Sequence, residues 1–194
     1  MNTIGTEEHF VTDEVVTAWS RLDPDSREDS SASTPPGEMG ERLREVGARR
    51  IAAMDEAGLD VQVISLTSPG LHSLPANEAT RLQVDTNDRI AELVNAHPNR
   101  FQGFATLAFP APVAAAQELE RAITKLGLNG ALIFGRTGER NLDHPDNWPI
   151  FEAAASLRAP LYIHPQIPQP RVRAALYAGF DNAIDNAFAT FGIG

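Results

Sequence analysis

The chain of 194 residues is long enough for one domain, or for one domain and part of another. Its hydrophobic content of 42%, with 7% aromatic residues, supplies a buried core and argues against wholesale disorder. A formal net charge of -10, with no clustered basic segment, argues against nucleic acid and against an anionic membrane surface as partners.

The absence of cysteine excludes disulfide bonds and metal sites built on thiolates. The first residues carry neither the basic segment nor the apolar segment of a secretion signal. No apolar run approaches the roughly 20 residues that a membrane helix requires. We therefore expect a cytoplasmic protein without a membrane partner.

The first short apolar segment, residues 3–6, leads directly into Glu7-Glu8-His9. Side chains alternate between the two faces of a strand, so Glu7 and His9 should point one way and Glu8 the other. A carboxylate and an imidazole placed in this way can bind the same small ligand, such as a divalent cation. Taken singly, a residue of this kind at a strand end is more often a solvated or hydrogen-bonded side chain; only the combination with a second such segment favours a site.

Residues 21–40 follow with almost no apolar side chains and with several Pro, Ser and Asp residues. This composition predicts a long mobile polar loop that leaves the strand end carrying Glu7 and His9. The loop is either an unstructured surface excursion or a lid over that strand end.

The rest of the chain alternates between short apolar runs and helical patterns. Continuous apolar runs, typical of strands buried on both faces, occupy residues 61–66, 101–107, 130–134 and 161–164. Helices are predicted at residues 44–57, 82–96, 113–126 and 147–157. Gly58 and Gly127 are expected to end two of these helices, and Asp146 to cap the last one. Strands separated by helices predict an α/β fold with a parallel sheet and right-handed connections.

Five strands can form a complete doubly wound sheet or the first five strands of a TIM-type (β/α) barrel. A closed barrel typically needs about 250 residues, so this chain is too short to close one. The last residues, 188–194, are apolar and carry no polar tail, as if the chain were cut within a domain.

His164 ends the last apolar run. In either architecture, sites form at the carboxyl ends of parallel strands, so Glu7, His9 and His164 should converge there. Two imidazoles and one carboxylate suit Zn²⁺ best among the common ions, while Mn²⁺ or Fe²⁺ would fit if more oxygen ligands join. No glycine-rich phosphate loop follows the first strand, and no Gly-x-Ser-x-Gly motif is present, so nucleotide binding and serine-hydrolase chemistry are disfavoured.

Three further residues are candidates for contact with a substrate: Phe10, Ser68 and His72. Phe10 lies beside the metal-binding motif, where it would either wall a pocket or join the core. Ser68 and His72 follow the second strand, at a rim where substrate could be met. For His72 we expect solvent exposure rather than contact.

The chain resembles the metal-dependent decarboxylases of the amidohydrolase superfamily, such as the γ-resorcylate and aminocarboxymuconate semialdehyde decarboxylases. The similarity runs in collinear order over nearly the whole chain, and no single motif carries it. The matching segments are Thr6-Glu7-Glu8-His9-Phe10, residues 50–66 with Met54-Asp55-Glu56-Ala57-Gly58, Ser68-Pro69-Gly70, Asn87-Asp88, Pro98-Asn99-Arg100-Phe101, Gly130-Ala131-Leu132 and Leu161-Tyr162-Ile163-His164-Pro165.

The resemblance implies an eight-stranded (β/α) barrel, truncated here after about five strands, in which residues 1–194 form the N-terminal portion. It implies Glu7, His9 and His164 as metal ligands. It also implies a catalytic His and an Asp ligand on later strands, which this sequence does not contain.

The implied activity is non-oxidative decarboxylation of a hydroxylated aromatic or related unsaturated carboxylic acid. An acid protonates the carbon that bears the carboxylate, and CO₂ leaves. Hydrolase relatives use the same metal site, so hydrolysis is a second hypothesis. Two further hypotheses are a silent fragment that pairs with another chain or with its own copy, and a doubly wound domain that binds a small ligand without metal. A homo-oligomer is expected, because an open barrel edge exposes strand amides and apolar surface.

Overall fold

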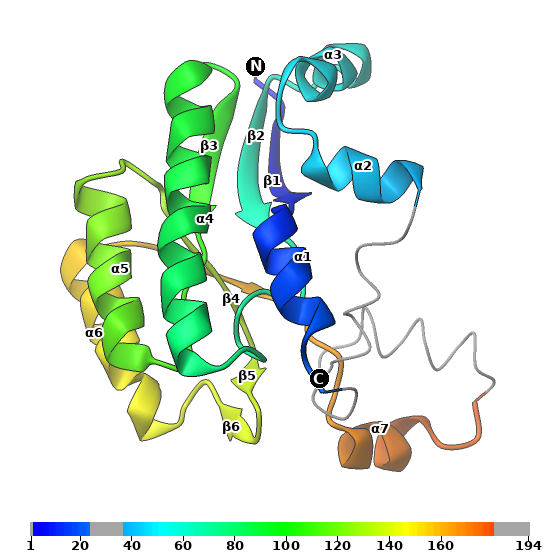
Figure 1. The fold of residues 1–194 in the computed structure, drawn as a ribbon, viewed down its shortest axis with the longest axis vertical. Helices are drawn as coiled ribbons and strands as arrows, with labels where there is room; N and C mark the ends of the chain where they lie inside the picture. Colours follow the sequence, from blue (N-terminus) through cyan, green and yellow to red (C-terminus); the bar gives the residue numbers. More distant parts are fainter. Residues whose placement is uncertain (1, 24–36, 181–194) are drawn as a thin grey trace.

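The computed structural model describes residues 2–23 and 37–180 (Figure 1). A five-stranded parallel sheet forms the centre of the described chain, in the order β1-β2-β3-β4-β7. Its strands are β1 (Ile4–Phe10), β2 (Val61–Leu66), β3 (Phe101–Ala105), β4 (Gly130–Phe134) and β7 (Leu161–His164). Each of these strands lies beside the one that precedes it along the chain. A doubly wound sheet reverses this order at a switch point, whereas a barrel does not, so the topology is that of a TIM-type barrel.

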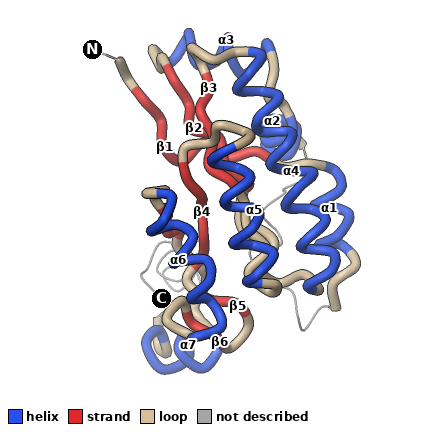
Figure 2. Tube along the Cα trace, turned by 90° about the vertical axis from the view of Figure 1, so that its left-hand side faces the viewer, coloured by secondary structure: helices blue, strands red, loops and turns tan. Residues whose placement is uncertain are grey.

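Helices fill the connections between these strands. They are α1 (Asp13–Ser20), α2 (Glu38–Arg44), α3 (Ala48–Ala57), α4 (Ala76–Ala96), α5 (Pro112–Thr124), the 3₁₀ turn η3 (Pro145–Asn147), α6 (Trp148–Leu157) and α7 (Pro170–Tyr177). The short strands β5 (Arg136–Thr137) and β6 (Arg140–Asn141) pair as an antiparallel hairpin. The helices α4, α5 and α6 lie side by side in Figure 1, and Figure 2 shows α1, α4 and α5 along one face of the strands. Within residues 2–23 and 37–180, no helix is both long and apolar enough to cross a bilayer.

The strand predictions are confirmed, with small differences at the ends. The bounds of β2, β4 and β7 are those expected, and β3 ends two residues earlier than predicted. The first strand continues through Glu7-Glu8-His9 to Phe10, so Glu7 and His9 lie within it.

Three helix predictions were wrong at the N-terminal boundary. The helix expected from residue 44 is split by Gly47 into α2 and α3, and the amide of Gly47 donates to the Glu45 side chain at 2.7 Å. Helix α4 begins directly after Pro75, earlier than predicted. Of the residues 76–81 that precede the predicted start, only Ala79 is buried, so they gave no apolar stripe. Asp146 does not cap α6; it lies in η3 and forms an ion pair with Arg140 at 2.7 Å. The expected cap at Gly58 is confirmed by its left-handed φ of 66°.

The predicted C-terminal boundary of the mobile polar loop at residues 21–40 was wrong. Helix α2 begins at Glu38, so the last three residues of that segment are helical. Residues 24–36, which make up most of the predicted loop, lie outside the described residues.

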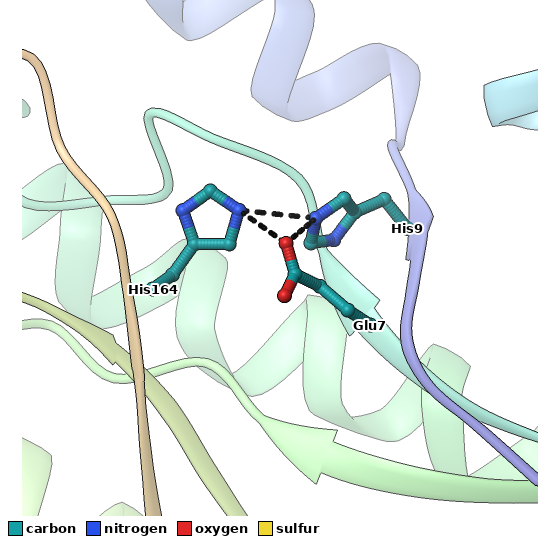
Figure 3. A group of neighbouring side chains, drawn as sticks. All are labelled: Glu7, His9 and His164. Carbon is teal, nitrogen blue, oxygen red and sulfur yellow. Dashed lines mark hydrogen bonds and ion pairs between the residues drawn. The ribbon is translucent and has the colours of Figure 1, made fainter. Parts of the chain in front are cut away.

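The sheet is curled rather than flat. In a flat sheet, four spacings of about 4.8 Å would place the edge strands β1 and β7 about 19 Å apart. Instead the Nε2 atoms of His9 on β1 and His164 on β7 are 3.2 Å apart (Figure 3). An irregularity in the β1–β2 register between Gly5 and Glu8 adds to the bend, as bulges do. The curl is that of part of a barrel, and it brings the two sheet edges together at their carboxyl ends.

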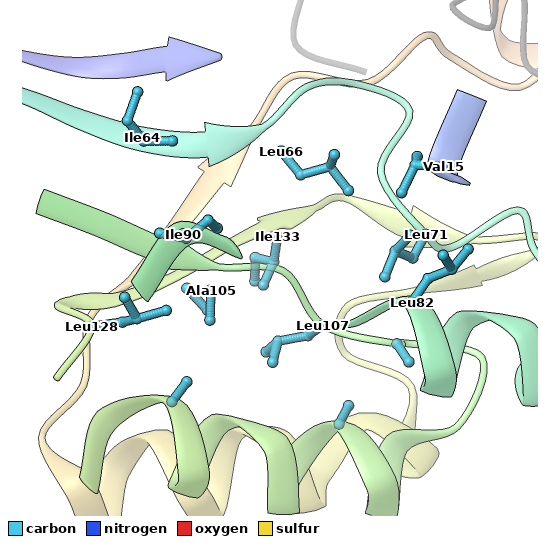
Figure 4. Close-up of a cluster of buried hydrophobic side chains, with 14 of the residues drawn as sticks. Val15, Ile64, Leu66, Leu71, Leu82, Ile90, Ala105, Leu107, Leu128 and Ile133 are labelled. Carbon is cyan, nitrogen blue, oxygen red and sulfur yellow. The ribbon is translucent and has the colours of Figure 1, made fainter. Parts of the chain in front are cut away.

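A continuous apolar core joins the sheet to its helices (Figure 4). Ile64 of β2 and Ile133 of β4 meet Ile90 of α4 in this core, and all three are almost fully buried. Gly103 of β3 allows α4 to approach closely, because a Cβ at this position would overlap the Ile90 side chain. The core therefore fixes the strands from outside the curl and leaves their carboxyl rim to polar side chains.

Candidate metal centre

The alternation of β1 places Glu7 and His9 on one face and Glu8 on the other, as predicted. Glu8 accepts a hydrogen bond from the Gln62 side chain of β2 at 2.8 Å, away from the other two residues. Glu7 and His9 both face His164, the last residue of β7.

One carboxylate oxygen and two imidazole nitrogens converge at this point. The Oε1 atom of Glu7 lies 3.1 Å from His164 Nε2 and 3.7 Å from His9 Nε2, and the two Nε2 atoms are 3.2 Å apart. Figure 3 shows the same oxygen facing both rings, while the second carboxylate oxygen turns away. The side chains of His9 and His164 are 20% and 15% exposed and that of Glu7 is 41% exposed, so the cluster is open to solvent on one side.

The far nitrogen of each imidazole is engaged by the protein. His164 Nδ1 lies 2.6 Å from the carbonyl oxygen of Pro165, which can only accept, so Nδ1 carries a proton and Nε2 is the nitrogen that faces the cluster. His9 Nδ1 pairs with Ser65 Oγ at 3.1 Å, from the neighbouring strand. Burial lowers the pKa of His9, and the nearby His164 lowers it further, although Glu7 opposes both effects. His9 is therefore held towards its neutral form, the form that binds metals.

The spacing of these three atoms fits a divalent ion. Two donors that each sit about 2.1 Å from one ion lie about 3.0 Å apart at a right angle and about 3.4 Å apart at the tetrahedral angle. The observed separations of 3.1 and 3.2 Å fall within this range, and the third, 3.7 Å between Glu7 Oε1 and His9 Nε2, lies slightly above it. One cluster of three His, Asp or Glu side chains in the described part of the chain is tight enough to hold a metal ion, and it consists of Glu7, His9 and His164.

The sequence did not single out Tyr162, Arg50 or Ser65, which support the cluster. Tyr162 donates its hydroxyl to Glu7 Oε2 at 2.8 Å, and this hydrogen bond raises the pKa of Tyr162. Arg50 donates to the carbonyl oxygen of His9 at 2.7 Å and so anchors the end of β1. Alternation along β7 already placed Tyr162 on the face of His164, whereas the roles of Arg50 and Ser65 depend on strand register and helix placement.

The three candidate substrate residues lie in different surroundings. Phe10 is 2% exposed and lies in the hydrophobic core, which is one of the two places considered for it. Ser68 is partly exposed in the loop after β2. His72 is only 5% exposed, so the expectation of solvent exposure was wrong; its ring packs against Phe134 with ring centroids 4.3 Å apart.

A cleft of about 760 Å³ borders the cluster on the β7 side. Its walls come from the β5–β6 hairpin and from the loop between β7 and α7, and His164 lies in its lining. Arg136 ties the two walls together by donating to the carbonyl oxygen of Ile167 at 2.8 Å. A small molecule in this cleft would lie beside His164.

Comparison with known proteins gives the same family from both sequence and structure. A family model described as "Amidohydrolase" matches residues 9–187. A γ-resorcylate decarboxylase of Polaromonas sp. JS666 is 35% identical over 186 residues, which cover 91% of this chain and 53% of that protein.

Two solved structures share the fold at similar identity. The 5-carboxyvanillate decarboxylase of Sphingomonas paucimobilis superposes with a TM-score of 0.84 at 35% identity, over 99% of this chain and 59% of that one. A dihydroxybenzoic acid decarboxylase of Polaromonas sp. JS666, with bound manganese and the inhibitor 2-nitroresorcinol, superposes with a TM-score of 0.75 at 34% identity, over 92% of this chain and 54% of that one. The chain spans about half the length of the curated γ-resorcylate decarboxylases that it matches.

Proposed function

The chain belongs to the amidohydrolase family, and from this membership we propose that its carboxyl-rim cluster serves a metal-dependent, non-oxidative decarboxylase. The proposed substrate is a hydroxylated aromatic or related unsaturated carboxylic acid. Relatives of this chain are named as decarboxylases of such acids, which supports the proposal. The observation that carries it is the convergence of Glu7, His9 and His164, from opposite edges of the sheet, on one point.

In this proposal Glu7 Oε1, His9 Nε2 and His164 Nε2 hold a divalent ion. When bound, the ion orients the carboxylate of the substrate and stabilises negative charge that develops during the reaction. Ser65 and the Pro165 carbonyl oxygen orient the two imidazoles. The cleft beside His164 offers room for the acid, and contact of Ser68 or His72 with substrate stays a prediction.

Manganese is the ion to test first, because a neighbour of similar fold carries it. Binding of Zn²⁺ remains a prediction that rests only on the residue types of the three candidate ligands, two imidazoles and one carboxylate. A cytoplasmic location and a homo-oligomer also remain proposals.

The metal-binding prediction can be checked with purified protein. We expect wild type to bind one Mn²⁺ per chain with an increase in thermal midpoint, because an ion that binds only the folded state stabilises it. His9→Ala and His164→Ala should each lose this binding and this increase. His97→Ala, a histidine at the end of α4, is the control and should behave as wild type. Equal Mn²⁺ binding by wild type and by both site variants would contradict the assignment.

The reaction class can be tested in a chimera in which this chain replaces the matched segment of the Polaromonas γ-resorcylate decarboxylase. With Mn²⁺ supplied, the chimera should release CO₂ from 2,6-dihydroxybenzoate, and Glu7→Gln in the same chimera should slow release by roughly 10–100-fold or more. Lactone or amide hydrolysis by a folded, metal-loaded chimera that releases no CO₂ would favour the hydrolase hypothesis. Circular dichroism and metal content would establish that both chimeras are folded and loaded.

A further inference from the structure

The carboxylate of Glu7 makes two different sets of contacts. Its Oε1 atom faces the two imidazole nitrogens at 3.1 and 3.7 Å. Its Oε2 atom turns away from the rings and accepts a hydrogen bond from the Tyr162 hydroxyl, with an oxygen–oxygen distance of 2.8 Å. The hydrogen bond therefore occupies one oxygen and leaves the other for the cluster.

Without such a partner, Glu7 would be poorly fixed. Its side chain is 41% exposed, and a glutamate loses substantial rotamer freedom when one orientation is imposed. The Tyr162 hydroxyl supplies a directional contact that selects one orientation.

Tyr162 is itself well placed to act as an anchor. It lies on β7 two residues before His164, so both side chains project to the same face of that strand. Its ring stacks on Phe104 of β3, with ring centroids 5.7 Å apart and an interplanar angle of 26°. A phenol ring has only two side-chain torsions, and aromatic stacking restrains both.

We propose that Tyr162 is a positioning residue for the metal centre, acting through Glu7. It holds the carboxylate so that Oε1 alone is presented beside His9 and His164. The inference rests on the proposed metal site. Strand β7 would then both supply His164 and, through Tyr162, orient Glu7 on the opposite edge strand β1. Groups that orient metal ligands in this way typically change metal affinity when they are removed.

The test is the affinity for Mn²⁺, measured by titration calorimetry on the protein without substrate. Tyr162→Phe removes the hydroxyl and keeps the ring on Phe104. We expect Mn²⁺ binding to weaken roughly 10–100-fold, with the thermal midpoint of the metal-free protein unchanged. Tyr177→Phe removes the hydroxyl of the chain's other tyrosine and should bind Mn²⁺ as wild type does.

A double-mutant cycle then shows whether Tyr162 acts through Glu7. Zn²⁺ is the probe for the cycle, because imidazole sites bind it more tightly than Mn²⁺ and the two histidines should still hold it in Glu7→Ala. Tyr162→Phe should weaken Zn²⁺ binding in the wild-type background and have no further effect in Glu7→Ala. If Tyr162 had only a structural role, Tyr162→Phe would instead weaken Zn²⁺ binding equally in both backgrounds.

The outcomes separate this inference from the proposed function. If Tyr162→Phe binds Mn²⁺ within twofold of wild type while His164→Ala does not bind, the role of Tyr162 is overturned and the metal site stands. Equal losses in both backgrounds of the cycle would likewise overturn it. If wild type itself binds neither ion, both proposals fail.

Discussion

His72 is a histidine enclosed within the protein. It is 5% exposed, its ring packs against Phe134, and its Nε2 atom is buried without a hydrogen-bond partner among the described residues. Burial lowers the pKa of His72 to about 3, and the charges of Arg136 and His164 lower it in the same direction. The imidazole is therefore neutral near pH 7, and its surroundings disfavour the charged form.

This shift predicts acid sensitivity of the fold. Between an unfolded pKa of about 6.5 and the folded value of about 3, the unfolded chain binds a proton that the folded chain does not. The unfolding free energy should therefore fall as the pH falls through this window, by up to about 1.4 kcal/mol per pH unit from this residue. Urea unfolding of wild type and His72→Leu at pH 7, 6 and 5 measures the effect, because the variant should lose this part of the slope.

His144→Leu provides the matched control for the pH series. His144 lies in the loop before η3 with a side chain that is 42% exposed, so it shows the effect of replacing a histidine outside the interior. Parallel slopes for wild type and His72→Leu would show that the buried imidazole does not contribute.

At the scale of elements, the loop after β3 is held by polar side chains of α4. Asn87 is fully buried and forms hydrogen bonds with both the amide and the carbonyl oxygen of Thr106, at 2.8 and 3.0 Å. It also donates to Glu118 of α5 at 2.8 Å, and Gln83 accepts from the amide of Ala108. One helix thus satisfies the backbone of the loop that leads from β3 into α5.

Loss of the Asn87 amide should therefore be costly. Asn87→Ala leaves the Thr106 amide and the Glu118 carboxylate without this partner in the interior, which predicts a loss of about 2–4 kcal/mol in unfolding free energy. Urea denaturation provides the measurement. Asn95→Ala, at an exposed position of the same helix, should change stability by less than about 0.5 kcal/mol. Equal effects of the two substitutions would contradict this account of the loop.

At the scale of the whole molecule, the site depends on the curl of the sheet. Glu7 and His9 belong to one edge strand and His164 to the other, and the core behind the strands holds the two edges within side-chain reach. The described chain supplies three candidate ligands. The chain spans about half the length of the curated relatives that it matches, and the resemblance implies a proton-handling His and Asp on strands that follow β7.

The 194-residue polypeptide assayed by itself should therefore bind Mn²⁺ yet release CO₂ from dihydroxybenzoates at close to the background rate. The chimera with the Polaromonas decarboxylase should release CO₂, and the two proteins can be compared at matched metal loading. A rate for the polypeptide alone that matches the chimera would show that residues 1–194 contain their own proton donor.

The sequence by itself determined the strands, the parallel α/β class and the pairing of Glu7 with His9. These properties depend on local patterns: continuous apolar runs, glycine at a helix end and the two-residue period of a strand. The same two-residue period would put Tyr162 on the face of His164, but the sequence analysis did not single out Tyr162, and no local pattern indicates its contact with Glu7 on the opposite sheet edge.

Only the tertiary structure decided which distant groups meet. The strand order excluded a doubly wound sheet, and the curl brought His164 to within 3.2 Å of His9. Burial turned His72, expected at the surface, into a neutral interior residue. The physical reason is the same in each case, because register, curvature and burial arise from contacts between segments far apart in the chain, and local sequence patterns do not encode such contacts.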